Sequence, residues 1–274
     1  MAEEIPLTGG NVATRVVRVG HTVRKPATQF DTATTALLAQ LQKSKIAGTP
    51  RPMGHDTQGR RVLSWVDGTT EFPTTMWSDD RTLVSAAKLL RRIHDASAPL
   101  YDDPHDWAYT HPDETQHKVI GHSDFAPYNM TFAPDGSVIG VFDFNLAGPA
   151  PRSRDLAYLA WWLVPLGRQD PAMAKAANTD IAQGSVRLHK ICATYGQPLA
   201  DAFLEMISDV LIHMSDEAAA SRMIGAKAAA RLKAEGHLDH WARASIDFAE
   251  IRPQIARSIQ DGQLVQSIQR DEQS

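Results

Sequence analysis

The feature that most constrains the fold is a change of hydrophobic periodicity early in the chain. Up to Gly68, short runs such as Val12–Val19 and Thr22–Lys25, joined at Gly20–His21, alternate apolar and polar side chains. β-Branched runs with so short a connection predict an antiparallel hairpin. Beyond that point strand patterns become rare and apolar residues recur at helical spacing. We therefore expect an α+β fold of two lobes, a small antiparallel β lobe followed by a larger helical lobe, with a cleft between them.

Other segments complete the first lobe, which we place at residues 1–68. A helix is predicted from Asp31 to about Lys43, because its leucines recur at helical spacing. The stretch Gly48–Gly59 is rich in turn-forming residues, and Arg61–Val66 has the residue types of a second apolar strand.

The second lobe, residues 69–274, is predicted to be mostly helical. An amphipathic helix should begin at Asp79 or Asp80 and run to about Ala96. From Arg154 to Gln269 the spacing is helical throughout. The remaining β-like runs are short: Lys118–Gly121, Asn129–Phe132 and Ser137–Phe142.

Composition excludes several classes of function. The chain of 274 residues has 28 basic and 32 acidic side chains, a formal charge of −4, which argues against nucleic-acid binding through a large positive field. The most apolar run, Leu156–Leu166, is shorter than the roughly 20 residues that a membrane-spanning helix needs. The acidic start lacks the regions of a signal peptide, and Cys192 is the single cysteine. We expect a cytoplasmic monomer or homodimer without nucleic-acid or membrane partners.

The densest polar cluster follows the pattern H-x-D-x4-N and consists of His122, Asp124 and Asn129. After a short turn, a hydrophobic strand ends at Asp143. Because the hairpin from Asn129 to Phe144 brings its two ends together, Asn129 and Asp143 are expected to lie close to each other. Carboxylate and amide oxygens suit Mg²⁺, and Asp124 on the preceding loop can accept the proton of an attacking hydroxyl. A lone aspartate in a turn usually forms only an Asx-turn, but the joint pattern favours function.

The stretch HSDFAPYN, followed by VFDFNLAGPAPRSRDLAYLAW, resembles the catalytic and metal-binding segments of the aminoglycoside phosphotransferase family. The resemblance implies a protein-kinase-like fold with ATP between the lobes. By it, Asp124 is similar to the catalytic-loop aspartate, Asn129 to the asparagine that holds Mg²⁺, and Asp143 to the second metal aspartate. His122 and Asp155 are expected to be structural, Asp155 as the buried helix aspartate that accepts hydrogen bonds from the catalytic loop.

The first lobe offers further candidates for nucleotide binding. The turn at Gly9 and Gly10 can bring backbone N–H groups close to phosphates. Arg24 and Lys25 point to opposite faces of their strand, so only one of them can enter the cleft. We favour Lys25, because Val23 then shares its face and can cover the adenine.

Two further features concern the same lobe. The segment before Gly68 resembles a kinase hinge, and the carbonyl of Ser64 and the N–H of Val66 are its expected adenine contacts. The predicted helix beginning at Asp31 contains no glutamate to pair with the strand cation. Its long polar acceptors are only Gln40 and Gln42.

These features together predict an ATP- and Mg²⁺-dependent kinase that transfers the γ-phosphoryl group to a hydroxyl of a small molecule, as aminoglycoside phosphotransferases do. Two alternatives stay open. The acceptor can instead be a choline-, homoserine-, sugar- or macrolide-type hydroxyl, because a fold does not determine a substrate. The chain can also be a non-catalytic, nucleotide-binding relative, as the missing glutamate suggests.

Overall fold

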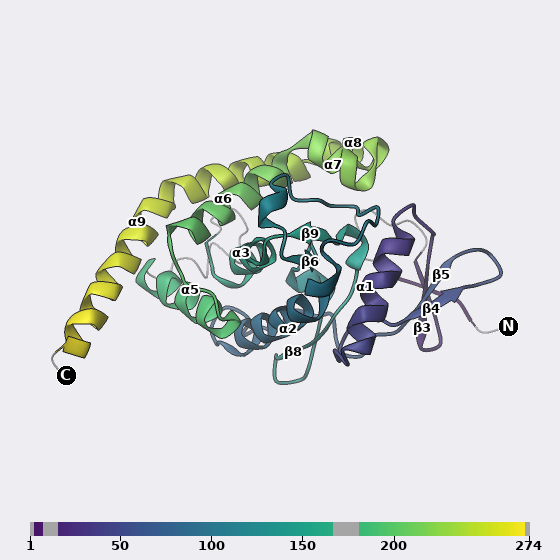
Figure 1. The fold of residues 1–274 in the computed structure, drawn as a ribbon, viewed down its shortest axis with the longest axis horizontal. Coiled ribbons are helices and arrows are strands. Elements are labelled where there is room, and N and C mark those ends of the chain that lie inside the picture. The colour runs from purple at the N-terminus through teal and green to yellow at the C-terminus, as the bar shows by residue number, and fades with distance from the viewer. Residues whose placement is uncertain (1–2, 8–15, 167–180, 272–274) are drawn as a thin grey trace.

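The computed structural model describes residues 3–7, 16–166 and 181–271, and Figure 1 shows its arrangement. A sheet with one helix occupies the N-terminal end, and the long C-terminal helix extends from the opposite end of the molecule. This α+β architecture, an antiparallel sheet before a mostly helical part, confirms the predicted fold class.

The N-terminal sheet has five antiparallel strands in the order β1-β2-β3-β5-β4. The strands are β1 (Ile5–Pro6), β2 (Val17–Val19), β3 (Thr22–Lys25), β4 (Pro52–His55) and β5 (Arg61–Ser64). The predicted hairpin is present, with Val19 opposite Thr22 in β2 and β3, but β2 begins at Val17, and residues 12–15 of the predicted run Val12–Val19 lie outside the described residues. Lys25 of β3 lies directly opposite Arg61 of β5, so both side chains project from the same face of the sheet.

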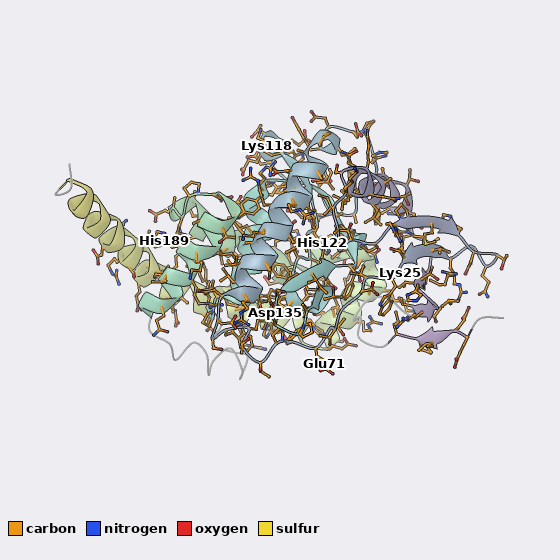
Figure 2. The ribbon with its side chains drawn as sticks, turned by 90° about the horizontal axis from the view of Figure 1, so that it is seen from below. Lys25, Glu71, Lys118, His122, Asp135 and His189 are labelled. Carbon is orange, nitrogen blue, oxygen red and sulfur yellow. The ribbon has the colours of Figure 1, made fainter. Side chains whose placement is uncertain are left out.

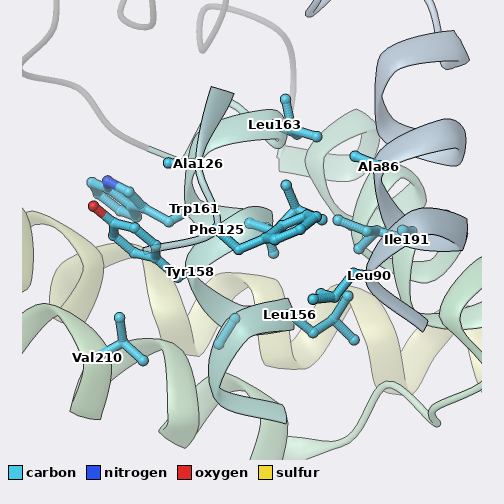
Figure 3. Packing of buried hydrophobic residues seen from close by; sticks show 14 of the residues in the cluster. Ala86, Leu90, Phe125, Ala126, Leu156, Tyr158, Trp161, Leu163, Ile191 and Val210 are labelled. Carbon is cyan, nitrogen blue, oxygen red and sulfur yellow. The ribbon is translucent and has the colours of Figure 1, made fainter. Parts of the chain in front are cut away.

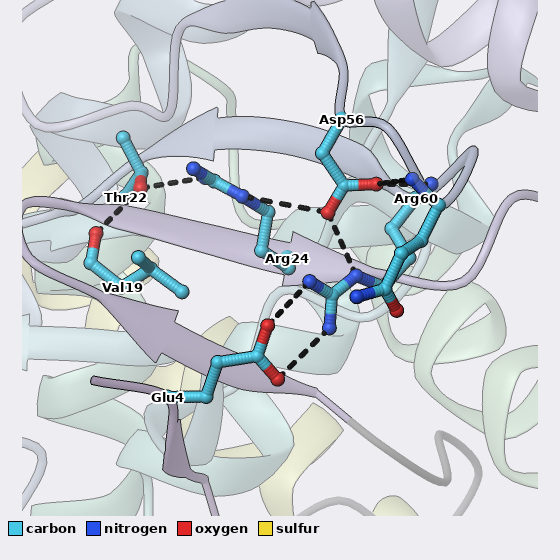
Figure 4. Close-up of polar contacts among 7 residues, drawn as sticks. Glu4, Val19, Thr22, Arg24, Asp56 and Arg60 are labelled. Carbon is cyan, nitrogen blue, oxygen red and sulfur yellow. Dashed lines mark hydrogen bonds and ion pairs between the residues drawn. The ribbon is translucent and has the colours of Figure 1, made fainter. Parts of the chain in front are cut away.

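The opposite face of the sheet carries Arg24 (Figure 4). Its Nη1 donates to the Thr22 hydroxyl at 2.6 Å and its Nε lies 3.7 Å from Asp56. Arg60 joins the same cluster through Asp56 and Glu4. Arg24 therefore belongs to a surface ion-pair cluster, whereas Lys25, on the other face, is only 7% exposed.

Helix α1 (Asp31–Lys43) packs beside the sheet with the predicted leucines inward, since Leu37, Leu38 and Leu41 are buried. The connection between the sheet and the helical part follows β5. There Gly68 adopts a φ of +120°, and a Cβ at this position would lie 2.8 Å from Thr131. The next residue, Thr69, exchanges backbone hydrogen bonds with Phe132. Glycine thus permits the chain to turn tightly against the first hairpin of the helical part.

Two short two-stranded sheets lie within the helical part. They consist of β6 (Val119–Gly121) with β9 (Gly148–Ala150) and β7 (Met130–Phe132) with β8 (Val138–Val141), each antiparallel. The strands β6, β7 and β8 lie within the predicted runs. Strand β9 was not predicted, and β4 lies inside the stretch that we expected to be turns. Both contain glycine and proline, which have low intrinsic strand propensity.

The helices of this part enclose a hydrophobic core, and the loop that carries Asp124 packs into it (Figure 3). They are α2 (Arg81–Ser97), α3 (Arg152–Leu163), α5 (Ile181–Tyr195), α6 (Asp201–Ser215), α7 (Glu217–Ile224), α8 (Ala226–Ala234) and α9 (His237–Asp271). Short 3-10 turns lie along the chain between α2 and α3: η1 (Ala98–Leu100), η2 (Glu114–Gln116), η3 (Pro127–Asn129) and η4 (Phe144–Leu146). Phe125 of the loop is fully buried among Leu90, Leu156 and Ile191. Because Phe125 directly follows Asp124, core packing fixes the position of that aspartate.

Among the described residues, no helix has the length and apolar character that crossing a bilayer demands.

Candidate active site

The loop that carries Asp124 is hydrogen-bonded through its backbone to Asp155 of α3, a residue that is 1% exposed. The carboxylate of Asp155 accepts hydrogen bonds from the backbone N–H of His122 at 2.6 Å and of Ser123 at 2.9 Å. Its Oδ2 also lies 3.1 Å from His94 Nε2. Because an ionised carboxylate can only accept, His94 donates from Nε2. The predicted structural role of Asp155 is therefore confirmed.

This anchor leads to a prediction about stability and pH. Burial alone would raise the pKa of Asp155, but the hydrogen bond and charge of His94 and the nearby Arg154 hold that pKa well below its usual range. A lowered native pKa adds stability that is present above about pH 4 and is lost as the pH falls toward the native pKa. We expect Asp155→Asn to reduce the free energy of unfolding at pH 7 by about 3 kcal/mol and to flatten the loss of stability in acid.

The measurement for Asp155 is urea unfolding of both proteins at a series of pH values. Asp95→Asn is the matched control, because Asp95 pairs with two arginines but is half exposed, and surface pairs contribute about 1 kcal/mol or less. An Asp155→Asn protein as stable as the control would contradict the anchoring role.

His122 connects the loop to the strand that precedes Asp143. Its Nδ1 accepts from the N–H of Asp124 at 3.3 Å, so Nε2 carries the proton and donates to the carbonyl of Phe142 at 2.9 Å. His122 thus joins the two segments that carry the candidate carboxylates, and its ring is buried. The expected structural role of His122 is confirmed.

Asp124 is held by two neighbours from its own loop. Its Oδ2 accepts from Asn129 Nδ2 at 2.8 Å, and its Oδ1 accepts a short hydrogen bond from the Tyr128 hydroxyl. Asn129 uses the same Nδ2 for a bond of 3.0 Å to the Asp124 carbonyl. Its amide oxygen is therefore not the atom engaged by Asp124, and it is the donor atom that a hard cation prefers.

Asp143 and Lys25 meet across the two parts of the molecule. Lys25 Nζ donates to Asp143 Oδ1 at 2.7 Å, and Figure 2 shows Lys25 in the sheet and His122 in the helical part. Asp143 has a φ of +67°, an unusual conformation for a residue other than glycine. Burial alone would raise the pKa of Asp143, but the Lys25 ammonium outweighs it and lowers that pKa.

The two candidate carboxylates have pKa values shifted in opposite directions. Burial raises the pKa of Asp124, and the nearby negative charge of Asp143 raises it further, despite the hydrogen bonds from Tyr128 and Asn129. Carboxyl groups whose environments separate their pKa values are typical of sites that divide proton transfer and cation binding. Asp143 therefore stays an anion, while Asp124 is the more basic group.

The missing glutamate has a structural counterpart that we did not predict. Asp31, the first residue of α1, pairs with Arg61 of β5 at 3.1 Å, and Arg61 Nη1 also lies 3.5 Å from the Asn145 side chain. Arg61 is 3% exposed. An ion pair between the helix and the sheet thus exists, but its cation is Arg61, and Lys25 pairs with Asp143 instead. Of the two glutamines, Gln40 donates to the carbonyl of Ala96 in α2.

The remaining predicted nucleotide residues are only partly placed. Val23 lies in β3, two residues before Lys25, opposite Leu63 of β5. Ser64 ends β5, where its hydroxyl accepts from the N–H of Arg51 at 2.9 Å, and Val66 follows the strand. Gly9 and Gly10 lie outside the described residues. The adenine and phosphate contacts of all six residues, Lys25 included, stay predictions.

The donor set fits a magnesium ion that is completed by phosphates and water. In the described part of the chain no three histidine, cysteine, aspartate or glutamate side chains converge as a metal cluster. A protein cage is therefore absent there, but Mg²⁺ commonly binds through one or two carboxylates together with substrate phosphates. Asp143 already holds a positive charge, that of Lys25, against its Oδ1. Asn129 and Asp143 are the residues that would hold Mg²⁺.

An antiparallel sheet with a lysine facing the helical part, above a loop with an aspartate and an asparagine, has the architecture of the kinase-like phosphotransferases. Residues 105–189 match the model of the phosphotransferase enzyme family. The trifolitoxin immunity protein of Rhizobium leguminosarum bv. trifolii is 34% identical over 197 residues, which cover 70% of this chain and 72% of that protein. The chain belongs to the phosphotransferase enzyme family, whose members are kinases with hydroxyl acceptors.

Solved structures show the same fold at low sequence identity. The gentamicin complex of APH(2")-IIa superposes with a TM-score of 0.55 at 12% identity, covering 93% of each chain. A choline/ethanolamine kinase family protein from Mesorhizobium loti has a TM-score of 0.51 at 14% identity, covering 94% of this chain and 92% of its own. These likenesses confirm the kinase-like fold.

Proposed function

We propose that the protein transfers the γ-phosphoryl group of ATP, in the presence of Mg²⁺, to a hydroxyl group of a small molecule. The observation that carries this proposal is the convergence of the Lys25 strand, which is distant in sequence, with the loop of Asp124 and the hairpin that ends at Asp143. Lys25 of the sheet contacts Asp143 after β8 at 2.7 Å, and Asn129 contacts Asp124 at 2.8 Å. The backbone links Asn129 to Phe142 at 2.9 Å, which joins the two pairs.

Each side chain has a definite task in this reaction. Asp124 accepts a hydrogen bond from the acceptor hydroxyl and takes its proton as the phosphoryl group is transferred. Asn129 fixes Oδ2 of that carboxylate. Asp143 and Asn129 offer oxygen ligands, and Mg²⁺ bound there would neutralise charge on the phosphates. Lys25 has three N–H donors, so its ammonium can hold the phosphates that are not transferred.

The raised pKa of Asp124 suits this role, because a base close in pKa to the working pH takes a proton more readily than a strongly acidic carboxylate. Positioning and electrostatics supply most of the catalysis in phosphoryl transfer. The buried anchors Phe125 and Asp155 provide that positioning here.

The relatives suggest a narrower acceptor class as a second candidate. One relative at 34% identity is an immunity protein against a toxin, and one structural neighbour binds gentamicin. We propose that the acceptor is a hydroxylated toxin or antibiotic, which phosphorylation would inactivate. Choline-, homoserine-, sugar- and macrolide-type hydroxyls are the competing acceptors.

The test has two stages. Thermal unfolding with ATP is measured first, with and without Mg²⁺, and we expect stabilisation that depends on Mg²⁺. ADP release is then measured across a panel of hydroxyl compounds that includes both antibiotics and metabolite-like alcohols. Stabilisation by ATP without ADP release for any compound would favour a non-catalytic, nucleotide-binding protein. Absence of both effects would overturn the proposal.

A further inference from the structure

Tyr128 lies between the proposed base and a second, buried tyrosine. It occupies a position of the H-x-D-x4-N loop at which the motif specifies no residue type. The Tyr128 hydroxyl donates to Asp124 Oδ1, and its oxygen lies 2.8 Å from the hydroxyl oxygen of Tyr158 in α3. Tyr158 is fully buried and belongs to the core cluster (Figure 3).

The direction of these hydrogen bonds follows from the number of protons. An ionised carboxylate has none to donate, so the single hydroxyl proton of Tyr128 is directed at Asp124. Tyr158 must then donate to Tyr128. The result is a chain of two donors that ends on Asp124 Oδ1.

The hydrogen bonds to Asp124 leave one position on its carboxylate for an acceptor hydroxyl. Oδ2 of Asp124 is engaged by Asn129, so both oxygens are fixed and the carboxylate cannot rotate freely. A carboxylate oxygen accepts two hydrogen bonds, and Tyr128 uses one of these positions on Oδ1. The second position remains for the hydroxyl that is to be phosphorylated.

Aromatic packing holds the Tyr128 ring in place. The ring meets Trp162 edge to face at 5.4 Å between centroids, and Trp162 meets Trp241 at 6.1 Å. Tyr158 packs against Trp241 at 5.8 Å. Such contacts have preferred geometries. The packing therefore restricts the Tyr128 ring and keeps its hydroxyl directed at Asp124. With 39% of Tyr128 exposed, its ring also reaches the surface beside Asp124.

We propose that Tyr128, supported by Tyr158, is a positioning residue that holds the carboxylate of the base Asp124 in the orientation that proton transfer requires. This inference rests on the proposed function, because it assigns Asp124 the role of base. Tyr128 itself neither binds the phosphates nor takes the proton of the acceptor.

The test compares Tyr128→Phe and Tyr158→Phe with Tyr101→Phe as the matched control, since Tyr101 follows η1 and its hydroxyl is hydrogen-bonded to Asp102 instead of Asp124. Removing the Tyr128 hydroxyl deletes a hydrogen bond to a charged group, so we expect kcat to fall about tenfold with the KM for ATP unchanged. A loss in kcat without a change in KM distinguishes a positioning role from a general loss of structure. Tyr158→Phe should produce a smaller change in the same direction, and Tyr101→Phe none.

A second readout is whether the effect of Tyr128→Phe depends on Asp124. In an Asp124→Asn background the Tyr128 hydroxyl has no carboxylate base to orient, so Tyr128→Phe should lower kcat no further. A tenfold loss in the wild-type background that disappears in the Asp124→Asn background supports the proposal. An unchanged kcat in Tyr128→Phe overturns it, and so does an equal loss in both backgrounds. A wild-type protein that phosphorylates no compound would refute the proposed function and with it the positioning role, whereas an active wild type matched by Tyr128→Phe refutes the positioning role alone.

Discussion

Replacing Asp124 with alanine is expected to lower turnover by a factor of about 10²–10⁴, the usual contribution of a positioned general base, while ATP binding stays nearly intact. The variant loses the carboxylate that accepts from Asn129 and Tyr128, but the groups proposed to hold Mg²⁺ and the phosphates remain. The lost step is proton removal from the acceptor, not nucleotide capture.

The measurement for Asp124 is ADP release at saturating acceptor, with nucleotide affinity determined separately by titration. Asp135→Ala is the control, because Asp135 is an exposed carboxylate on the β7–β8 hairpin, hydrogen-bonded to Ser137 and labelled in Figure 2. Turnover of Asp124→Ala equal to that of the control would remove Asp124 from the mechanism. Loss of nucleotide binding together with turnover would instead indicate a structural role.

Asp143→Asn is the second change with a large expected effect. The substitution keeps the size of the side chain but removes the charge that pairs with Lys25 at 2.7 Å. A metal ion contributes several kcal/mol to stabilising the transition state, and each 1.36 kcal/mol corresponds to a factor of ten. We expect turnover about 10³-fold lower and an ATP affinity that no longer increases with Mg²⁺.

Two measurements check this second expectation: turnover as a function of Mg²⁺ concentration, and thermal stabilisation by ATP with and without Mg²⁺. Asp135→Asn is the control of equal charge change on the same hairpin. An Asp143→Asn protein whose turnover and Mg²⁺ dependence stay within tenfold of the control would show that Asp143 is not a cation ligand.

The parts of the molecule that could be predicted from sequence are those encoded locally. The helix at Asp31–Lys43 carries its own leucine spacing, and the hairpin at Val19 and Thr22 carries β-branched residues around a two-residue turn. The same holds for the candidate site. Asp124 and Asn129 belong to one short loop, and a single hairpin carries the chain from Asn129 to Asp143, so spacing alone brings them together.

Other elements depend on contacts distant in sequence. Strand β9 contains Gly148, whose Cβ position would lie 1.7 Å from the carbonyl oxygen of Tyr109, so only glycine fits there. Its pairing with β6 exists because the fold brings the two segments together, not because Gly-Pro-Ala favours a strand. A residue type that local propensity disfavours is therefore required by the tertiary structure.

The partners of charged residues could not be predicted from the sequence either. The sequence shows that α1 has no glutamate. Nothing in it identifies Arg61 of the sheet as the partner of Asp31 in α1. Tyr128 was visible inside the motif, yet its contact with Tyr158 needs α3 to pack beneath the loop. The one sequence signal for this residue was that Arg61 is a cation inside a predicted apolar strand. Its place opposite Lys25 is known only from the structure.

The most direct test of the central claim is whether an acceptor gains a phosphoryl group. Wild type and Asp124→Ala are each incubated with ATP, Mg²⁺ and the panel of hydroxyl compounds, and mass spectrometry follows the acceptors while ADP is quantified. We predict a phosphorylated acceptor formed in equal amount with ADP by the wild type, and at least a hundredfold less by Asp124→Ala. Equal product formation by the two proteins would contradict the account, as would a wild type that binds ATP and phosphorylates nothing.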